Sequence, residues 1–338
     1  MLLPTVDAAP PIDEIAAQLG AEDELLVICD AADDPVAVAA EANELPTGVR
    51  LVVAGDPERC SGKANAIAVG METARHERLV WTDDDYHHPG DWLATLQADY
   101  ERNGPSTELP VFRGRDPLAV LLEPSYLCNG TLGVFTNETA WGGAVIFERS
   151  DLERPDGRGS GSDRPAGRSL DSTSHEFGVQ QRALSSETDA EASLRRGLRR
   201  TISDDGLLTQ YLDVTSVHRI REVPVGGSTR TTLERHVRFY QIVRYFEPTA
   251  LVGMALASLV AVVAIVVAPL LALFLGTLTV GAVYAWFGVR RWTFLLAYPA
   301  LLVQVPLTGY ALARRTFVWG SRRYRWRSTF DVDVVEES

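Results

Sequence analysis

The longest uncharged run in the sequence limits the possible folds more than any other feature. From Thr249 to Val289, 41 consecutive residues contain no Asp, Glu, Lys or Arg. That length is about twice the roughly 20 residues that cross a bilayer core as one helix. The run therefore predicts a hairpin of two membrane spans over residues 249–289. Pro269 lies near its middle, where a tight connection is expected.

A further uncharged segment, Trp292–Ala313, follows Arg290 and Arg291 and contains two prolines. It fits either a third span or a proline-broken helix in the membrane interface. Residues 314–338 then mix six arginines with aromatic residues and end in an acidic stretch. Such a mixture predicts a tail at the cytoplasmic membrane surface. Because three spans would separate Arg290 and Arg291 from this tail, a hairpin is expected and the topology of residues 292–313 stays open.

The charge of the chain is concentrated in its first part. Residues 1–150 carry 26 Asp and Glu against nine Lys and Arg, which argues against nucleic acid as a partner because phosphate backbones bind positive surfaces. Lys63 is the only lysine among 32 basic residues. An acidic surface almost free of lysine indicates a high-salt cytoplasm and a halophilic archaeon; ordinary acidic solubility is the alternative. The three cysteines lie far apart, so no disulfide framework or zinc site is predicted.

Residues 1–150 also alternate two kinds of segment. Three short apolar runs predict strands, at Leu25–Cys29, Val49–Val53 and Leu79–Thr82. Three other stretches predict helices, at Ile12–Leu19, Pro35–Ala42 and Ala64–Ala74. The alternation predicts an α/β fold with a mostly parallel sheet flanked by helices. Ligands of such sheets bind at the carboxyl ends of the strands.

Carboxylates follow two of the predicted strands. Asp30 could accept hydrogen bonds from a nucleotide base or ribose, or it could cap the helix that starts near Pro35. In the triplet Asp83–Asp85, alternate side chains project the same way, so Asp83 and Asp85 can share one divalent cation with a diphosphate. Mg²⁺ or Mn²⁺ suits such oxygen ligands. A solvated acidic turn is the alternative.

Three weaker motifs lie nearby. Lys63, after Ser61 and Gly62 at the start of a predicted helix, could face a phosphate, although a solvated lysine is the usual case. The pair His87 and His88 could ligate a metal but is expected to be on the surface. The glycine-rich residues 157–161 superficially suggest a phosphate loop. Without a flanking strand and helix, residues 154–193 are expected to form a disordered insertion.

Taken in order, the motifs resemble inverting family-2 glycosyltransferases of the GT-A fold. The resemblance is carried by Asp30, Gly62–Ala66, Val80–Asp85 with Pro89–Leu93, Trp141–Ala144, Phe147–Leu152 and Ile202–Leu208. Arg235–Phe239 resembles the (Q/R)xxRW signature of the family, with Phe239 where Trp is usual. This signature and the ending Trp319–Tyr324 are most similar to the ceramide glucosyltransferase branch. The resemblance implies a catalytic domain over residues 1–248.

The resemblance implies a role for each matching residue. Asp30 would hold the base or ribose, with Lys63 at the edge of the nucleotide. Asp83, Asp84 and Asp85 would form the DxD motif, in which Asp83 and Asp85 bind the metal and the sugar diphosphate. Asp205 would be the general base, assisted by Asp204, and Arg235 and Arg238 would steady the diphosphate. Gln241–Tyr245 is a second candidate for that last role and fits the family spacing less well.

The implied activity is transfer of a sugar from a nucleotide-diphosphate sugar, with a divalent metal, to an acceptor. The membrane segments that follow the arginine signature favour a lipid acceptor. Met1–Pro4 lacks the features of a signal peptide, so we expect a multi-pass membrane protein with a cytoplasmic catalytic domain. A transporter or assembly subunit, and a catalytically inactive relative acting as a scaffold, are the alternatives.

Overall fold

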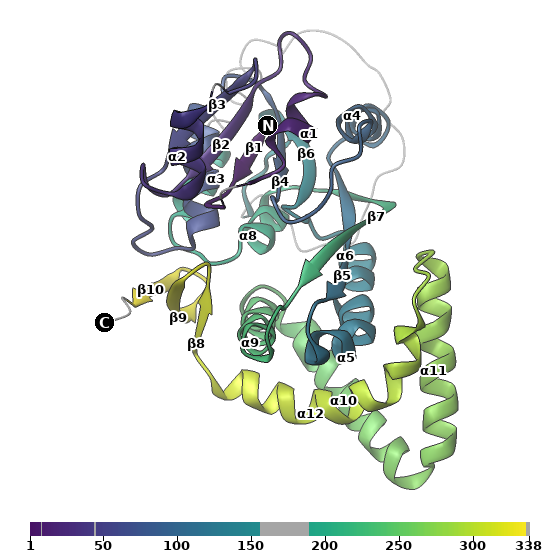
Figure 1. Cartoon of the computed structure of the whole chain (residues 1–338). Coiled ribbons are helices and arrows are strands. Elements are labelled where there is room, and N and C mark those ends of the chain that lie inside the picture. Colours follow the sequence, from purple (N-terminus) through teal and green to yellow (C-terminus); the bar gives the residue numbers. More distant parts are fainter. Residues whose placement is uncertain (8, 44, 156–188, 336–338) are drawn as a thin grey trace, which may run out of the picture.

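The computed structural model describes residues 1–7, 9–43, 45–155 and 189–335, as an α/β part joined to a group of long helices (Figure 1). A seven-stranded sheet has the order β3-β2-β1-β4-β6-β5-β7. All its strands run parallel except β6, which is antiparallel to both neighbours. The strands are β1 (Leu2–Pro4), β2 (Leu25–Cys29), β3 (Val49–Val53), β4 (Arg78–Thr82), β5 (Ser106–Gly114), β6 (Ala144–Glu148) and β7 (Thr215–Val225). The predicted mostly parallel sheet is confirmed.

Helices flank this sheet, as the sequence predicts. They include α1 (Ile12–Ala16), α2 (Pro35–Ala42), α3 (Gly62–Thr73), α4 (Trp92–Asn103) and α8 (Asp204–Tyr211). Three bounds differ from the prediction, one of them by a single residue at the end of α3. Helix α1 ends before Leu19 because the chain tightens there, with the Leu19 N–H donating to the Ala16 carbonyl. Helix α3 starts earlier, because the Ser61 side chain caps it by accepting from the Ala64 N–H at 3.1 Å.

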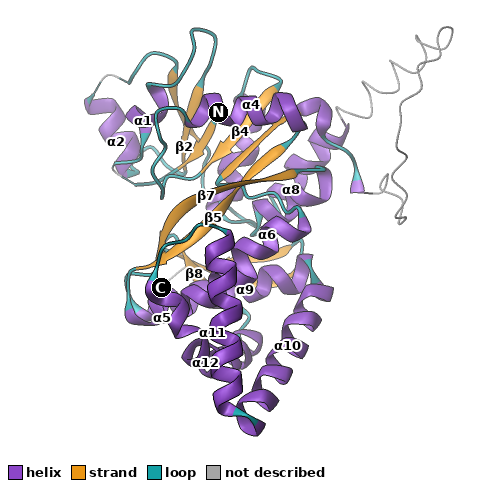
Figure 2. Cartoon of the chain, turned by 90° about the vertical axis from the view of Figure 1, so that its right-hand side faces the viewer, coloured by secondary structure: helices purple, strands orange, loops and turns teal. Residues whose placement is uncertain are grey.

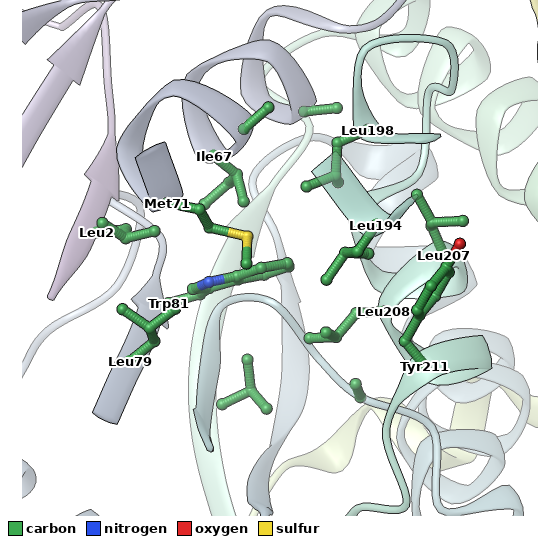
Figure 3. Close-up of a cluster of buried hydrophobic side chains, with 14 of the residues drawn as sticks. Leu2, Ile67, Met71, Leu79, Trp81, Leu194, Leu198, Leu207, Leu208 and Tyr211 are labelled. Atoms are coloured by element: carbon green, nitrogen blue, oxygen red, sulfur yellow. The ribbon is translucent and has the colours of Figure 1, made fainter. Parts of the chain in front are cut away.

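One core cluster ties the elements that lead into the site (Figure 3). Trp81 of β4 is fully buried between Met71 of α3 and leucines that include Leu194 and, from α8, Leu208. Truncating a buried side chain of this size typically costs roughly 3–5 kcal/mol. The same packing therefore fixes the end of β4, just before Asp83, against the start of α8.

The predicted insertion at residues 154–193 is only partly described, because residues 156–188 lie outside the described residues. Residues 189–198 form a helix, so the expectation of disorder is wrong for residues 189–193. Ala190, Leu194 and Leu198 recur every four residues and are buried in the core cluster. An apolar stripe at helical spacing explains why this segment is ordered.

Below the sheet, α9 (Thr229–Phe246) leads into a hairpin of α10 (Pro248–Val267) and α11 (Pro269–Trp286), visible in Figures 1 and 2. The short helix η4 (Trp292–Leu296) and α12 (Ala297–Ala313) follow. Four described stretches are long and apolar enough to cross a membrane: Pro117–Asn137, Pro248–Val267, Pro269–Trp286 and Trp292–Ala313. Pro269 starts α11 at the predicted connection.

The first of these stretches was not predicted from the sequence. It consists of α5 (Pro117–Tyr126), the π-helix η1 (Leu127–Thr131) and α6 (Leu132–Asn137). Leu127 of η1 packs in one cluster with Leu109 of β5 and Tyr284 of α11. This stretch therefore connects the sheet to the hairpin.

The C-terminal residues fold into a three-stranded antiparallel sheet of β8 (Thr316–Trp319), β9 (Arg322–Ser328) and β10 (Asp331–Val335). Tyr324 and Trp326 are 2% and 0% exposed and pack in one cluster with α9 residues such as Tyr240. They are therefore not the membrane-surface aromatics that the sequence suggested. Alternate residues of a strand share a face, which buries these rings and leaves Arg325 and Arg327 exposed.

Candidate active site

A cavity of about 700 Å³ lies where the parallel strands end and continues between α6, α9 and α10. It is lined by the residues to which the family resemblance assigns a role: Asp30, Lys63, Asp83, Asp84, Asp85, Asp204, Asp205, Arg235 and Arg238. These residues come from β-strand ends, helix starts and α9, over more than 200 positions of the chain.

Lys63 lies at the centre of this group. Its Nζ is 2.6 Å from Asp83 Oδ1 and 3.0 Å from Asp204 Oδ2. Burial alone would lower the pKa of Lys63, but the carboxylates of Asp204, Asp83 and Asp205 raise it well above its usual value. The amine therefore stays charged and joins β4 to the start of α8. The alternative of a solvated lysine is wrong, whereas the predicted place of Lys63 at the edge of the nucleotide stays a prediction.

Asp205 lies next to the buried Asp204 at the start of α8 and is itself only partly buried. Its Oδ1 accepts a hydrogen bond from the Gly142 N–H at 2.7 Å. Burial and the adjacent Asp204 charge raise the pKa of Asp205 to about 8. Ser203, which caps α8 by accepting from the Gly206 N–H, holds the two aspartates in the first turn.

Gly142 and Gly143 make room for these carboxylates. A Cβ atom at Gly142 would lie 2.5 Å from Asp205 Oδ1 and 2.6 Å from Asp204 Oδ2. A Cβ atom at Gly143 would lie 2.8 Å from Asp83 Oδ2. The segment Trp141–Ala144 thus needs glycine at both positions. A side chain at Gly142 would collide with the two aspartates, and one at Gly143 would collide first with the Trp141 ring and then with Asp83.

The acidic triplet follows β4. Burial and the Asp83 charge raise the pKa of Asp85 to about 7, and burial raises the pKa of Asp84 to about 6. Within the described residues, no group of three or more His, Cys, Asp or Glu side chains is placed to hold a metal ion. A cation here would therefore need ligands from a substrate or from water as well.

The two histidines after the triplet differ. His87 is exposed, as predicted, whereas His88 is 1% exposed and its Nε2 lies 2.8 Å from Thr82 Oγ1. The surface prediction is wrong for His88, because its ring packs between Tyr86 and Trp92. Burial lowers the pKa of His88 to about 4. A neutral ring in this position supports the end of β4 and does not face the cavity.

Two arginines of α9 form the opposite wall. Arg235 lies over the rings of Phe112 and Tyr126, at 4.2 and 5.0 Å from the ring centres. Arg238, one turn later, lies 3.9 Å from the centre of the Trp319 ring. Burial lowers the pKa of both guanidinium groups, that of Arg238 to about 10. Aromatic faces hold these cations in place, and no described carboxylate forms an ion pair with either.

In the second arginine candidate, Gln241–Tyr245, the polar side chains lie outside the cavity, although Ile242 and Val243 line it. Gln241 donates to the carbonyl oxygens of Ala311 and Arg314, and Arg244 lies over the Tyr245 ring. Neither residue lines the cavity, whereas Phe239 does. As candidates for binding the diphosphate, Arg235 and Arg238 are therefore better placed than Gln241–Tyr245.

The C-terminal sheet closes the end of the cavity that holds Asp30. Arg322 of β9 pairs with Asp30 and, at 2.7 Å, with Asp56. The Gly62 N–H at the start of α3 donates to the Tyr324 hydroxyl at 3.4 Å. Asp30 does not cap α2, because Asp34 holds that position. The sequence shows the segment Trp319–Tyr324 only as a resemblance to the ceramide glucosyltransferase branch. Its contacts with Asp30 and Gly62 are not predictable from the sequence, because they join residues far apart in the chain.

The other end of the cavity is apolar. Its lining comes from Val134 of α6, Phe246 of α9, and Ala250 and Met254 of α10. At this end Asn137 of α6 donates to Glu247 at 3.3 Å, across the junction of α9 and α10. The cavity therefore passes from charged groups to the base of an exposed apolar helix.

Comparison with known proteins gives a match to one part of the chain. Residues 9–136 match the family model described as glycosyl transferase family 2. This part of the chain is therefore similar to that family, and it contains strands β2 to β5 of the mostly parallel sheet that the GT-A fold predicts. The match agrees with the predicted glycosyltransferase fold over those residues.

Solved structures with a similar backbone include two glycosyltransferases. Glucosyl-3-phosphoglycerate synthase from Mycobacterium tuberculosis, with Mn²⁺, uridine-diphosphate-glucose and phosphoglyceric acid, is 18% identical; the match covers 46% of this chain and 58% of that one, with a TM-score of 0.30. A mannosyltransferase from Pyrobaculum calidifontis, with GDP-Man and Mn²⁺, is 19% identical over 90% of this chain and 85% of that one, with a TM-score of 0.40. The chain thus spans less than two thirds of the mycobacterial structure. No curated protein sequence matches it.

Proposed function

We propose that this protein is a membrane-anchored glycosyltransferase that moves a sugar from a nucleotide-diphosphate sugar to a lipid acceptor, with inversion at the anomeric carbon. The observation that carries the proposal is the course of the cavity, which joins Asp205 to Met254 on α10. Helix α10 is long enough to cross a bilayer. A cavity that leads from a membrane helix to buried carboxylates suits an acceptor held in the bilayer.

Asp83 and Asp85 would hold a divalent cation, Mg²⁺ or Mn²⁺, together with the donor diphosphate. Their fit rests on the oxygen ligands that two neighbouring carboxylates offer. Desolvation and the nearby Asp83 charge raise the pKa of Asp85, and a cation would relieve the repulsion between the two carboxylates. Two carboxylates suffice for Mg²⁺, which commonly completes its shell with phosphate oxygens and water. When bound, the cation would neutralise charge on the leaving diphosphate.

The side chains around the proposed cation site would carry out proton transfer and bind the diphosphate. Asp205 would take the proton of the acceptor hydroxyl, and a pKa raised to about 8 suits a base near neutral pH. Lys63 holds Asp204 in place, so one free base acts and direct displacement inverts the sugar. Arg235 and Arg238, which have no described ion-pair partner, would bind the diphosphate oxygens.

The nucleotide would occupy the Asp30 end of the cavity, with its base or ribose on Asp30 and Asp84 facing the donor. Within the family, the arginine signature and Trp319–Tyr324 support a branch similar to ceramide glucosyltransferase. The low lysine content supports a halophilic archaeal source. A cytoplasmic catalytic domain completes the proposal.

A catalytically inactive relative serving as a membrane scaffold is the second candidate. It is favoured by the cations that already neutralise two proposed ligands, Lys63 on Asp83 and Arg322 on Asp30. Phe239 in place of the usual Trp points the same way. In this case the cavity would bind no donor.

Thermal unfolding of the full chain, purified in detergent and high salt, separates the two candidates. A panel of nucleotide sugars is added with and without Mn²⁺, and the best donor is then supplied in labelled form with a lipid extract. We expect one donor to raise Tm by several degrees only with Mn²⁺, and label to enter the lipid fraction. Stabilisation by no donor would establish the scaffold, and label found only on water-soluble acceptors would refute the lipid acceptor.

A further inference from the structure

We propose that α12 lies flat on the lipid bilayer, with its outward side chains in the interface, and that the α10–α11 hairpin is the part of the C-terminal region that enters the membrane. The sequence of Trp292–Ala313 fits a third span equally well. The proposal assigns a lipid surface as the partner of α12. It is independent of the donor and of the acceptor.

Both ends of α12 are attached to helices that support the sheet. Before its start, Glu123 of α5 accepts from Arg291 at 2.8 and 2.9 Å and from Thr293 at 2.6 Å. At its end, Arg314 pairs with Glu234 of α9 at 3.2 Å. The 17 residues of α12 rise about 26 Å at ~1.5 Å per residue. A spanning helix would carry one end across a hydrocarbon core of about 30 Å, away from the domain.

The middle of α12 is also fixed to α9. Gln304 and Thr308 both donate to the Tyr240 hydroxyl, at 2.6 and 2.8 Å. Small residues on the same side of the helix are buried: Ala297, Ala300 and Ala311. These contacts at start, middle and end place α12 across the lower side of the domain, as Figure 1 shows.

The opposite side of α12 is apolar and exposed. Its large residues are Leu302 (49% exposed), Val305 (40%) and Leu312 (36%), and Leu295 of the preceding η4 (54%) continues this side. Trp292 before its start and Tyr310 near its end are also exposed, at 61% and 37%. Aromatic rings at both ends of an apolar face are typical of a helix lying in the membrane interface.

The neighbouring hairpin indicates which partner covers this face. Near its tip, Val267 and Leu270 are 76% and 81% exposed. Large apolar side chains exposed along helices of this length indicate that the hydrocarbon of a bilayer covers them. Helix α12 packs against both α10 and α11, so its outward face continues their apolar surface. Arg290 and Arg315, exposed beyond the two ends of α12, can then reach lipid phosphates on one side of the bilayer.

The test is the sidedness of two single-cysteine variants, R290C and R315C, of the full chain in sealed proteoliposomes. The chain without either change gives the background from its native cysteines. An impermeant maleimide should label both positions from the same side, to within about twofold. Labelling from opposite sides would overturn the proposal, because a span between them would then be required.

Spin labels at L302C and L312C give a second measurement that does not depend on vesicle orientation. We expect both labels at a similar shallow depth, judged by their relative exposure to oxygen and to a water-soluble nickel complex. A label at residue 302 near the bilayer centre, with residue 312 at the surface, would indicate a span and refute the proposal. Disulfide-linked dimers of L302C would instead show that a second copy covers this face, and would also refute it.

Discussion

At the scale of single residues, Asp205 is the side chain on which the proposed chemistry depends. It lines the cavity, and its Oδ1 accepts a hydrogen bond from the Gly142 N–H. Replacing it with asparagine keeps the shape but removes the ability to take a proton. Because general-base catalysis typically contributes 10²–10⁴-fold, we expect D205N to lower the transfer rate by about 10³-fold.

The affinity for the donor distinguishes a general base at Asp205 from a residue that only maintains the structure of the site. D205N should bind the nucleotide sugar within about twofold of the unchanged enzyme, as measured by isothermal titration with Mn²⁺ present. D213N, at an exposed position two residues past the end of α8, is the matched control and should retain full transfer. Transfer by D205N at the normal rate would exclude Asp205 as the base.

Arg322 illustrates a residue whose importance the sequence does not reveal. Its partner Asp30 is 5% exposed, and removing a cation from a buried carboxylate is destabilising. We expect R322A to lower the free energy of unfolding by about 1–3 kcal/mol, less than for a fully buried pair because Arg322 is partly exposed. Chemical denaturation in detergent measures this change.

A double-mutant cycle that combines R322A with D30N measures the interaction free energy between Arg322 and Asp30. The two changes together should destabilise the protein by less than the sum of the single changes. The reason is that R322A leaves the Asp30 carboxylate without its cation, and this cost disappears when D30N has already removed the negative charge. R325A, on the exposed side of β9, should change the stability by less than about 0.5 kcal/mol. Strict additivity of R322A and D30N would show that the contact does not stabilise the docked sheet.

At the scale of elements, α6 and α10 form the proposed path of the acceptor. Met254 lines the apolar end of the cavity, so M254W should obstruct a lipid chain while leaving the charged end untouched. We expect transfer to the lipid to fall at least about tenfold, with donor binding unchanged. Initial rates with a lipid extract and titration of the donor provide the two readings.

The control for this element lies on the same helix. Leu259 is 60% exposed and does not line the cavity, so L259W should leave transfer unchanged. An equal loss in both variants would indicate a general effect on α10. Normal transfer by M254W would exclude this end of the cavity as the acceptor path.

The strands and helices of the first half of the chain can be predicted from local sequence patterns. The contacts within the site can be predicted only in part. Strands β2 and β3 were predicted with their observed bounds because each is a short apolar run between turn residues. The contact of Arg322 with Asp30 joins positions 292 residues apart, and no local pattern encodes such a pairing. Lys63 shows the same limit: its position at a helix start was readable, but its two carboxylate partners depend on how β4 and α8 pack.

At the scale of the whole molecule, the uneven charge of the chain predicts its response to salt. The first 150 residues carry 26 acidic against nine basic residues, and such an excess destabilises a compact domain through self-repulsion. The screening length falls from about 30 Å at 0.01 M salt to about 3 Å at 1 M. Repulsion across the acidic domain is therefore strong at low salt and nearly absent at high salt.

We expect Tm, measured in an uncharged detergent, to rise steadily between 0.01 and 1 M KCl, with the steepest change at the low end. The short ion pairs inside the site, such as Lys63 with Asp83 at 2.6 Å, are partly buried and are screened much less, so they should not reverse the trend. A variant with exposed acidic residues of the first domain changed to neutral ones, such as E22Q and E58Q, should show a weaker dependence. A Tm that falls with added salt would mean that ion pairs outweigh the repulsion, and that the acidic surface is not an adaptation to high salt.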